Sequence, residues 1–362
     1  MPSVATPTIP PTQTAITQHA GGELKVTNDV PVAEVGAGWL LVRNETVALN
    51  PCDFKMAMRF PTPGLLDGVD FAGTVVNTGP DPSHGFNVGD RVFGCVPGNK
   101  QDDPESGSFC QFVKVEAIYA WKIPDEMSFE TASALCAACI VTIGLTMHQC
   151  FKMAVTPERL TDGKPRGTVL VYGGSSSVGL VAIQLLKICG YEIITTCSPS
   201  NFELVKQYGA DVVFDYHSPT CAADIKKYTK NGLKYVIDPF GEASTLTLCY
   251  NAIGRAGGIY CALEHYQESL CTRKTVKHHF IMGPSVNGRG VILPEPYGVA
   301  PDPELHEWSK EFYSVIQGLI NDGSLKPLPI RRVEGSFEGI LKGLDILKNK
   351  QVSGAKLIVP LA

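Results

Sequence analysis

The spacing of apolar and polar residues changes along the 362-residue chain. Between residues 15 and 120, short segments alternate apolar and polar positions and are separated by turn residues, which predicts a β-rich domain. Residues 128–152 have the spacing of a helix, and residues 156–167 form a polar linker. From residue 168 to about residue 283, apolar runs alternate with amphipathic segments, which indicates a parallel sheet with helices. Helices at 304–321 and 337–349 and a strand at 355–362 follow.

Residues 168–190 are predicted to form a buried strand, a turn of glycines and serines, and an amphipathic helix. Such a turn directs backbone N–H groups toward the pyrophosphate of a dinucleotide. The string is Gly174-x-Ser176-x-x-Gly179, with a serine where the usual G-x-G-x-x-G pattern has its second glycine. An ordinary strand-to-helix turn, in which Ser175 or Ser176 caps the helix, therefore stays an alternative.

The next predicted strand, residues 192–196, ends where the ribose of a bound dinucleotide should lie. No Asp or Glu follows within residues 197–201. A carboxylate there would bind the 2′-hydroxyl of NAD and repel the 2′-phosphate of NADP, so its absence favours NADP. Ser198, Ser200 and Asn201 could donate hydrogen bonds to that phosphate, and Tyr216 could stack on the adenine. A plain capped helix start at this position is the alternative.

Composition excludes several classes of protein. A net charge of −5 and a pI near 5.9 lack the basic footprint of a nucleic-acid binder. The twelve cysteines are scattered, and the close pair Cys136 and Cys139 has no second pair or nearby histidine, so we expect reduced core residues in a cytoplasmic protein. The longest apolar stretch, 132–147, is shorter than the roughly 20 residues of a membrane span. The first fourteen residues, with four prolines, are predicted to form an extended arm rather than a targeting peptide.

Several strings together resemble the medium-chain dehydrogenase/reductase superfamily, in its zinc-free, quinone-reductase-like branch. They are NPCDFKM at 50–56, GVDFAGTVVNTG at 68–79, NVGDRVFG at 87–94 and GSFCQFV at 107–113. The resemblance implies an α/β protein with two domains. Residues 166–289 would form an NADPH-binding Rossmann domain with a doubly wound parallel sheet. Residues 1–165 and 290–362 would form a β-rich, GroES-like catalytic domain.

Two positions speak against a metal site in this branch. Zinc-containing members hold the ion in the substrate cleft with a cysteine, a histidine and usually a glutamate. Val69 stands at the position of that histidine and Asn50 at the position of that cysteine, and the four-cysteine structural zinc segment is absent. We therefore expect no metal ligands. A hydride acceptor activated without a metal suits reduction of a conjugated C=C bond better than oxidation of an alcohol.

Within this branch, further strings are similar to stand-alone, trans-acting enoyl reductases of fungal polyketide pathways, of the lovastatin type. They include LVYGGSSSVG at 170–179, TTCSPSNFELVKQYGADVVFDY at 195–216 and MGPSVNGRG at 282–290. This resemblance implies secondary metabolism, with hydride transfer from NADPH to the β-carbon of an α,β-unsaturated polyketide thioester. The partner would be the acyl-carrier domain of an iterative polyketide synthase, or of a hybrid of such a synthase with a peptide synthetase.

Two other functions stay open. They are an NADPH-dependent reductase of quinones or free enones, and an NADPH-binding protein without catalysis. No nucleic acid or membrane is expected as a partner, and a monomer is compatible with the sequence.

The resemblance also implies the residues of the site. Lys55 and Thr142 are the candidate catalytic residues, because negative charge gathers on the thioester oxygen during reduction and needs a donor. Without the resemblance, Lys55 would be taken as a surface lysine and Thr142 as a helix hydroxyl bonded to its own backbone. The implied cofactor-lining residues are Cys52, Asp53, Phe54, Lys55, Ser175, Ser176, Ser177, Val178, Ser198, Pro199, Ser200, Asn201, Tyr216, Leu263, Glu264, Val352 and Ser353. The implied acyl-pocket residues are Ile140, Val141, Thr142, Ile143, Gly144, Leu145, Thr146, Met147, Gly283, Pro284, Ser285, Val286 and Asn287.

Overall fold

The computed structural model describes residues 9–80, 85–157 and 164–361, which belong to two compact units. Unit 1 is Met1–Ala138, Ile316–Asp322 and Pro327–Ala362, and unit 2 is Cys139–Val315 and Gly323–Lys326. The predicted domains placed 139–165, 290–315 and 323–326 with the β-rich part, whereas the clustering of contacts assigns these residues to unit 2. One reason is visible in the packing: the Sγ atoms of Cys150 and Cys261 are 3.4 Å apart, which joins the helix before residue 152 to the parallel sheet.

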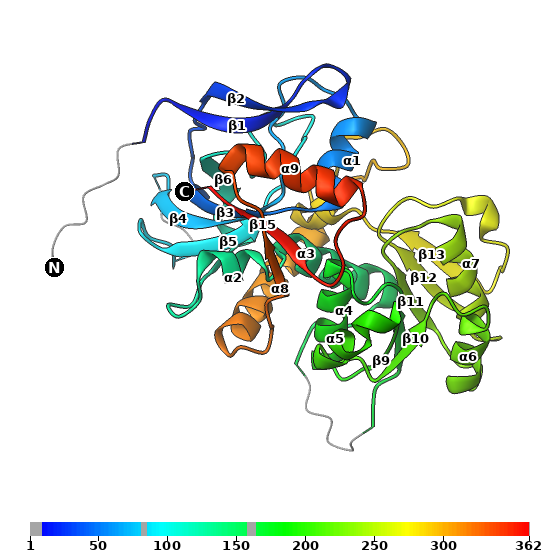
Figure 1. The fold of residues 1–362 in the computed structure, drawn as a ribbon. Coiled ribbons are helices and arrows are strands. Elements are labelled where there is room, and N and C mark those ends of the chain that lie inside the picture. Colours follow the sequence, from blue (N-terminus) through cyan, green and yellow to red (C-terminus); the bar gives the residue numbers. More distant parts are fainter. Residues whose placement is uncertain (1–8, 81–84, 158–163, 362) are drawn as a thin grey trace. The chain divides into compact units, whose positions relative to one another are not determined.

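Unit 2 is built on a six-stranded parallel sheet, as predicted (Figure 1). Its strands are β8 (Thr168–Val171), β9 (Glu192–Cys197), β10 (Val212–Asp215), β11 (Tyr235–Asp238), β12 (Gly258–Ala262) and β13 (Val276–Phe280). Their order is β10-β9-β8-β11-β12-β13, with every neighbouring pair parallel. This is the Rossmann order, in which the direction of winding reverses between β8 and β11.

Helices cover both faces of this sheet (Figure 1). They are α4 (Ser177–Ile188), α5 (Phe202–Gln207), α6 (Cys221–Tyr228) and α7 (Ala243–Ala252). On the face of α6 and α7, Leu170, Val236 and Tyr260 of the strands join Ile225 and Leu246 of the helices in one buried cluster. Burial on both faces explains why the sequence shows continuous apolar runs here instead of alternation.

A long apolar helical run begins in unit 1 and continues into unit 2. Unit 2 contains most of α3 (Ala137–Leu145), the π-helix η4 (Thr146–Phe151), the short helices η5 (Pro199–Asn201), η6 (Glu268–Leu270) and η7 (Gly283–Asn287), and most of α8 (Pro303–Asn321). In the described part of the chain, Phe129–Phe151 is long and apolar enough to cross a membrane, and 78% of its most apolar window is buried. Cys136, with φ at +60°, interrupts the helix within this run. The apolar residues therefore serve as core.

Unit 1 contains two sheets, in which almost all neighbouring strands are antiparallel. The strands are β1 (Thr12–Gln18), β2 (Leu24–Pro31), β3 (Trp39–Ala48), β4 (Asp70–Asn77), β5 (Arg91–Cys95), β6 (Phe112–Glu116), β7 (Ala120–Lys122), β14 (Ile330–Arg332) and β15 (Lys356–Pro360). β1 pairs with β2, and the larger sheet runs β14-β15-β3-β4-β5-β7 with β6 beside β3. β14 is parallel to β15, and the other pairs of this sheet are antiparallel.

The prediction of an extended arm was wrong for residues 12–14, because β1 begins at Thr12 and pairs with β2. Residues 1–8 of that arm lie outside the described residues. Further along β1, Ala15 and Ile16 are fully buried, so this segment belongs to the core of unit 1.

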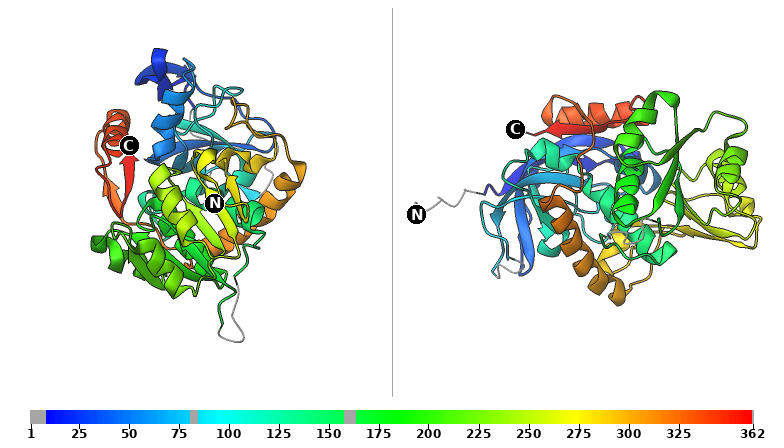
Figure 2. Two further views of the ribbon diagram at one scale, coloured as in Figure 1. Left: turned by 90° about the vertical axis from the view of Figure 1, so that its right-hand side faces the viewer. Right: turned by 90° about the horizontal axis from the view of Figure 1, so that it is seen from below.

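Three helices accompany the strands of unit 1: α1 (Pro51–Arg59), α2 (Phe129–Ser133) and α9 (Ser336–Lys348). Short helices also form at η1 (Ala20–Gly22) and η3 (Ala117–Tyr119). α9 lies along β15, the last strand, and both are red in Figure 2. Phe337, Ile340 and Leu344 of α9 pack on Leu357 and Val359 of β15 in one buried cluster. The amphipathic spacing predicted for 337–349 is therefore the inner face of α9.

Two glycines that both lie in helices should respond in opposite directions to substitution by alanine. A Cβ on Gly179, near the start of α4, would lie 2.5 Å from the backbone oxygen of Gly173, whereas a Cβ on Gly318, within α8, would meet nothing within 4 Å. We expect Gly179→Ala to lower the stability by about 1–3 kcal/mol through overpacking and Gly318→Ala to raise it by about 0.5–1 kcal/mol through helix propensity. Urea unfolding measures both. Equal signs for the two variants would contradict this description of the β8–α4 turn.

Candidate active site

The turn between β8 and α4 contains the predicted glycine and serine string. Gly173 has φ at +65°, and the backbone of Gly179 approaches it too closely for a side chain, so the turn requires both glycines. Ser176 caps α4, since its Oγ accepts the N–H of Gly179 at 3.1 Å. The capping alternative is therefore realised. The Ser176 cap is compatible with anion binding, because the N–H groups of Ser177 and Val178 begin the helix and have no acceptor within it.

The segment after β9 places its hydroxyl groups at the same edge of the sheet. Ser198 and Asn201 precede η5 and α5, but neither side chain caps its helix. The Oγ of Ser198 lies 3.4 Å from the hydroxyl of Tyr216, which follows the neighbouring strand β10. Pro199 and Ser200 are exposed. The side chains thus do not adopt the capped-helix alternative, and polar groups gather at the carboxyl ends of β9 and β10.

Aromatic rings lie beside these hydroxyl groups. The ring of Tyr172, which follows β8, is 6.1 Å from the ring of Tyr216 and 5.9 Å from that of Phe240. Tyr216 is 36% exposed and Phe240 is 39% exposed. Phe240 was not predicted from the sequence, although it follows the buried strand 235–238 next to the point where the strand order reverses. Exposed rings at this edge suit contact with a flat ligand.

Asp238, the last residue of β11, holds the loop that contains Phe240. Its Oδ1 accepts the backbone N–H groups of Phe240 at 2.9 Å and Gly241 at 3.3 Å, and its Oδ2 accepts the hydroxyls of Thr245 at 2.6 Å and Tyr260 at 2.8 Å. Burial raises the pKa of Asp238, and these donors oppose the shift. Asp238 was also missed from the sequence, where an acidic residue closing a buried parallel strand was the available signal.

The predicted residues Leu263 and Glu264 follow β12 and lie at the same edge of the sheet. The N–H of Leu263 donates to the backbone oxygen of Asp238 at 3.0 Å. Glu264 Oε1 accepts the hydroxyl of Tyr297 at 2.7 Å and the N–H of His265 at 3.0 Å. Both residues are half-buried. The structure therefore brings Leu263 to the loop that Asp238 organises.

Thr142 and Gly283 come together within unit 2. A Cβ on Gly283 would lie 2.9 Å from Thr142 Oγ1, so the two predicted acyl-pocket segments are in contact. Thr142 is half-buried, whereas the other predicted residues from Ile140 to Met147 are buried, as are Ser285 and Val286. A cavity of about 370 Å³ in unit 2 is lined instead by His148, Lys152, Met153, Ala154, Val155, Thr156, Trp308, Glu311, Phe312 and Val315. Of the predicted pocket, Thr142, Gly283, Pro284 and Asn287 keep some exposed surface.

In unit 1, the predicted residues around α1 differ in exposure. Cys52 is exposed, Phe54 and Lys55 are half-buried, and Asp53 is buried at 1% exposure. The Oδ2 of Asp53 accepts the N–H of Asn50 at 2.7 Å, so this carboxyl stabilises the start of the helix. Phe54 and Val352 pack against the α9 cluster, and Ser353 beside Val352 is exposed. Asp53 was predicted to line the cofactor, but its carboxyl is directed inward.

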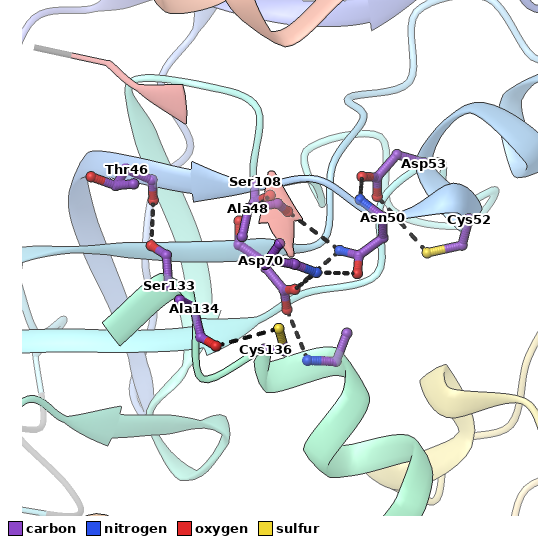
Figure 3. A network of polar contacts seen from close by, with 12 residues as sticks. Thr46, Ala48, Asn50, Cys52, Asp53, Asp70, Ser108, Ser133, Ala134 and Cys136 are labelled. Atoms are coloured by element: carbon purple, nitrogen blue, oxygen red, sulfur yellow. Dashed lines mark hydrogen bonds and ion pairs between the residues drawn. The ribbon is translucent and has the colours of Figure 1, made fainter. Parts of the chain in front are cut away.

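A buried network joins the start of α1 to β4 and β15. The Nζ of Lys356 donates to Asn50 Oδ1 at 2.6 Å and to Asp70 Oδ2 at 3.2 Å. The Nδ2 of Asn50 donates to the same Oδ2 of Asp70 at 3.0 Å, and the N–H of Ala138 donates to Asp70 Oδ1 at 2.8 Å (Figure 3). Lys356 and Asp70 were not predicted as functional residues. Asn50 was noted only because it replaces a metal ligand.

Two further carboxyl groups are buried close to this network, Asp53 and Asp67. Burial is the largest cause that raises the pKa of Asp53, followed by the charge of Asp67, and Lys356 opposes the shift. Burial raises the pKa of Asp67 to about 7, although the N–H of Gly68 and the amide of Asn99 donate to it. Among the described residues, Asp67 Oδ2 has no hydrogen-bond partner. This cluster of acids therefore retains a proton near neutral pH.

Comparisons with known proteins agree over nearly the whole chain. Residues 36–125 match the family described as alcohol dehydrogenase GroES-like domain, and residues 177–282 match the family described as zinc-binding dehydrogenase. Enoyl reductase cheB of Chaetomium globosum is 48% identical over 98% of this chain and 95% of its own. Trans-enoyl reductase RAP1 of Pyricularia oryzae is 47% identical over 98% and 99%. The crystal structure of CurK enoyl reductase has a TM-score of 0.74 at 18% identity, covering 96% of this chain and 99% of its own.

The proton on Asp67 should make stability depend on pH. Folding raises the pKa of Asp67 from 3.8 to about 7, so between these values the native state binds more protons than the unfolded state, and the free energy of unfolding falls as pH rises. Asp67→Asn keeps the acceptor oxygen and removes this titration. We expect wild type to lose about 1–3 kcal/mol relative to Asp67→Asn between pH 5 and pH 8.

Urea unfolding at a series of pH values measures this difference. Asp345→Asn, which changes an exposed carboxyl of α9, is the matched control and should follow wild type. Parallel pH curves for wild type and Asp67→Asn would show that Asp67 is ionised in the native state across this range.

Proposed function

Since the chain belongs to the family of fungal trans-enoyl reductases, within the medium-chain dehydrogenase/reductase superfamily, we propose that it reduces an α,β-unsaturated polyketide thioester. The observation that carries this proposal is the similarity to enoyl reductases along nearly the whole chain. It confirms the enoyl reductase predicted from the sequence. The fold agrees as well, because a Rossmann sheet supplies a dinucleotide site at the carboxyl ends of its strands.

NADPH is the hydride donor of this reaction. Unit 2 fits it: the glycine turn leaves the N-terminus of α4 open for a pyrophosphate, and no carboxylate stands within residues 197–201. We assign the 2′-phosphate to Ser198, Ser200 and Asn201, and the adenine to Tyr216. The loop held by Asp238 would keep Phe240 and Leu263 in place beside the cofactor.

Reduction places negative charge on the thioester oxygen, and a hydrogen-bond donor must be aimed at it. Two candidates are the hydroxyl of Thr142 in unit 2 and the ammonium of Lys55 in unit 1. Thr142 is half-buried, and its hydroxyl lies beside Gly283. Lys55 lies one residue after Phe54, whose ring packs on the α9 cluster. A proton for the α-carbon would come from water or from one of these groups.

We propose that the reaction needs no zinc. Val69 cannot bind a metal, and the amide oxygen of Asn50 accepts a hydrogen bond from the ammonium of Lys356. A positive charge 2.6 Å from that oxygen would repel a cation. Purified protein should therefore contain much less than one zinc per chain, and a chelator should leave turnover unchanged.

The natural substrate would be bound to a polyketide synthase, in the cytoplasm. We propose that its acyl-carrier domain, in an iterative synthase or in a hybrid with a peptide synthetase, presents the enoyl chain to a single copy of this protein. NADPH oxidation should be faster with an enoyl pantetheine thioester than with a quinone or a free enone of equal size. Faster turnover of the quinone would favour the alternative reductase. A lack of turnover with every acceptor would favour a binding protein without catalysis.

Loss of a donor should slow the reaction without unfolding the protein. We expect Lys55→Ala or Thr142→Ala to reduce turnover of the enoyl pantetheine thioester by about 10²-fold, the usual effect of removing one oxyanion donor. Lys55→Arg and Thr142→Ser keep a donor and are the matched controls. Wild-type turnover in either alanine variant would remove that residue from the mechanism. A lower melting temperature with an unchanged rate would assign Thr142 to the core.

The 2′-phosphate assignment predicts a change in cofactor preference. Ser198→Ala combined with Ser200→Ala removes two hydroxyls that would donate to a charged phosphate, and each such bond contributes about 1.5–3 kcal/mol. We expect NADPH binding to weaken at least tenfold while NADH binding stays the same, as measured by fluorescence titration. Ser269→Ala, an exposed serine on η6, should change neither constant. Equal losses for both cofactors would place the phosphate elsewhere.

A further inference from the structure

Asn50, Asp70 and Lys356 form a closed ring of hydrogen bonds in unit 1, which we name the polar triangle. Each member contacts both others, at 2.6, 3.0 and 3.2 Å. Asn50 is 5% exposed, and the side chains of Asp70 and Lys356 are each 2% exposed. Because an ammonium and a carboxylate flank it, the amide of Asn50 has one possible orientation, with its oxygen toward Lys356 and its nitrogen toward Asp70.

Such a triangle contributes little to the stability of a fold, because burying its charges costs free energy. Removing an ammonium and a carboxylate from water costs several kcal/mol each, and apolar residues of similar volume are often equally stable. What the triangle adds is a fixed direction for the groups it binds. One of these groups is Asn50, whose amide oxygen and amide nitrogen are each bound to a charged partner.

Asn50 is the residue from which α1 starts. It is the N-cap of that helix, and its N–H is bound by Asp53 Oδ2 at 2.7 Å. Lys55 follows five residues later, in the second turn of α1. Because an α-helix is rigid over this distance, a rotation of its first residue is transmitted to the direction of the Lys55 side chain. The triangle therefore holds the residue from which the helix of Lys55 starts.

We propose that Lys356 and Asp70 are positioning residues, which act through the Asn50 amide to orient α1 and hence the ammonium of Lys55. The inference rests on the proposed function, in which Lys55 aims a donor at the thioester oxygen. Lys356 itself is buried at 2% exposure and is not assigned any contact with substrate.

Asn50→Ser tests this role without removing a charge. Serine is as good an N-cap as asparagine, so α1 should still form, and the Lys356–Asp70 ion pair stays in place. The amide that couples the ion pair to α1 is lost. We expect a melting temperature close to wild type and a turnover of the enoyl pantetheine thioester reduced roughly tenfold or more, since small misplacements of a reacting group have large effects on rate.

The readout that separates positioning from stability is the coupling to Lys55. In the Lys55→Ala background, Asn50→Ser should change turnover by less than about twofold, because the group being positioned is already absent. Lys342→Met, an exposed lysine of α9, is the control and should leave turnover unchanged in both backgrounds. The same tenfold loss in both backgrounds would mean that the triangle acts on the fold alone, and this would overturn the inference.

A second variant covers the case in which Asn50→Ser does not fold. Lys356→Met combined with Asp70→Asn removes both charges together and avoids leaving one of them unpaired, and it should show the same coupling to Lys55. If Lys55→Ala alone keeps wild-type turnover, the role proposed for Lys55 fails and the inference fails with it. If Lys55→Ala is slow but neither triangle variant is, only the inference is overturned.

Discussion

The architecture of unit 1 depends on the contacts that the buried ammonium of Lys356 makes with Asn50 and Asp70. This ammonium comes from the last strand and is bound by Asn50 at the start of α1 and by Asp70 at the start of β4. Without it, Asp70 would be a carboxylate at 1% exposure with no opposite charge in contact, a situation that costs several kcal/mol. The segment that includes Cys52 and Lys55 is thus anchored by a residue some 300 positions away.

In unit 2 a different buried carboxylate, Asp238, holds a backbone segment in place. Asp238 ends β11 and binds two backbone N–H groups and two hydroxyls, so the loop before α7 has a defined course. That loop brings Phe240 next to Tyr172 and borders Leu263. In each unit a buried carboxyl group, Asp70 or Asp238, holds a backbone segment in place. Partly exposed side chains next to these segments are the ones proposed to bind cofactor or substrate.

Features that depend on residues close in the sequence could be predicted. The strand, turn and helix over 168–190 were predicted correctly, because local spacing and glycine positions determine them. The end of β9 was also predicted correctly, to within one residue. The triangle could not be predicted: Lys356 is 286 and 306 positions from its partners, and nothing local marks a lysine in an apolar strand as buried.

The burial of individual site residues was the other property that could not be predicted from the sequence. Spacing placed Ile140 to Met147 on a helix but could not say which residues face the core, and only Thr142 among them is partly exposed. The same holds for Asp53, whose resemblance to a family motif says nothing about where its carboxyl points. Such outcomes depend on packing between distant segments.

The family description matched by residues 177–282 names zinc, whereas the positions expected to hold the ion are Val69 and Asn50. An ammonium on the oxygen of Asn50 supplies the only positive charge in contact with that amide among the described residues. The chain therefore shares the fold of this family and belongs to its enoyl reductases. At the positions expected to hold zinc, however, Asn50 is bonded to the buried ion pair of Lys356 and Asp70.

The central claim is that hydride passes to the β-carbon of an enoyl thioester. The most direct measurement is the transfer of deuterium to an enoyl pantetheine thioester from NADPH in which both hydrogens at C4 of the nicotinamide are deuterium, followed by NMR of the product. We expect deuterium at the β-carbon alone, in one configuration, and an unlabelled α-carbon that takes its proton from solvent or a side chain. NADPH consumption without deuterium at the β-carbon would contradict the account.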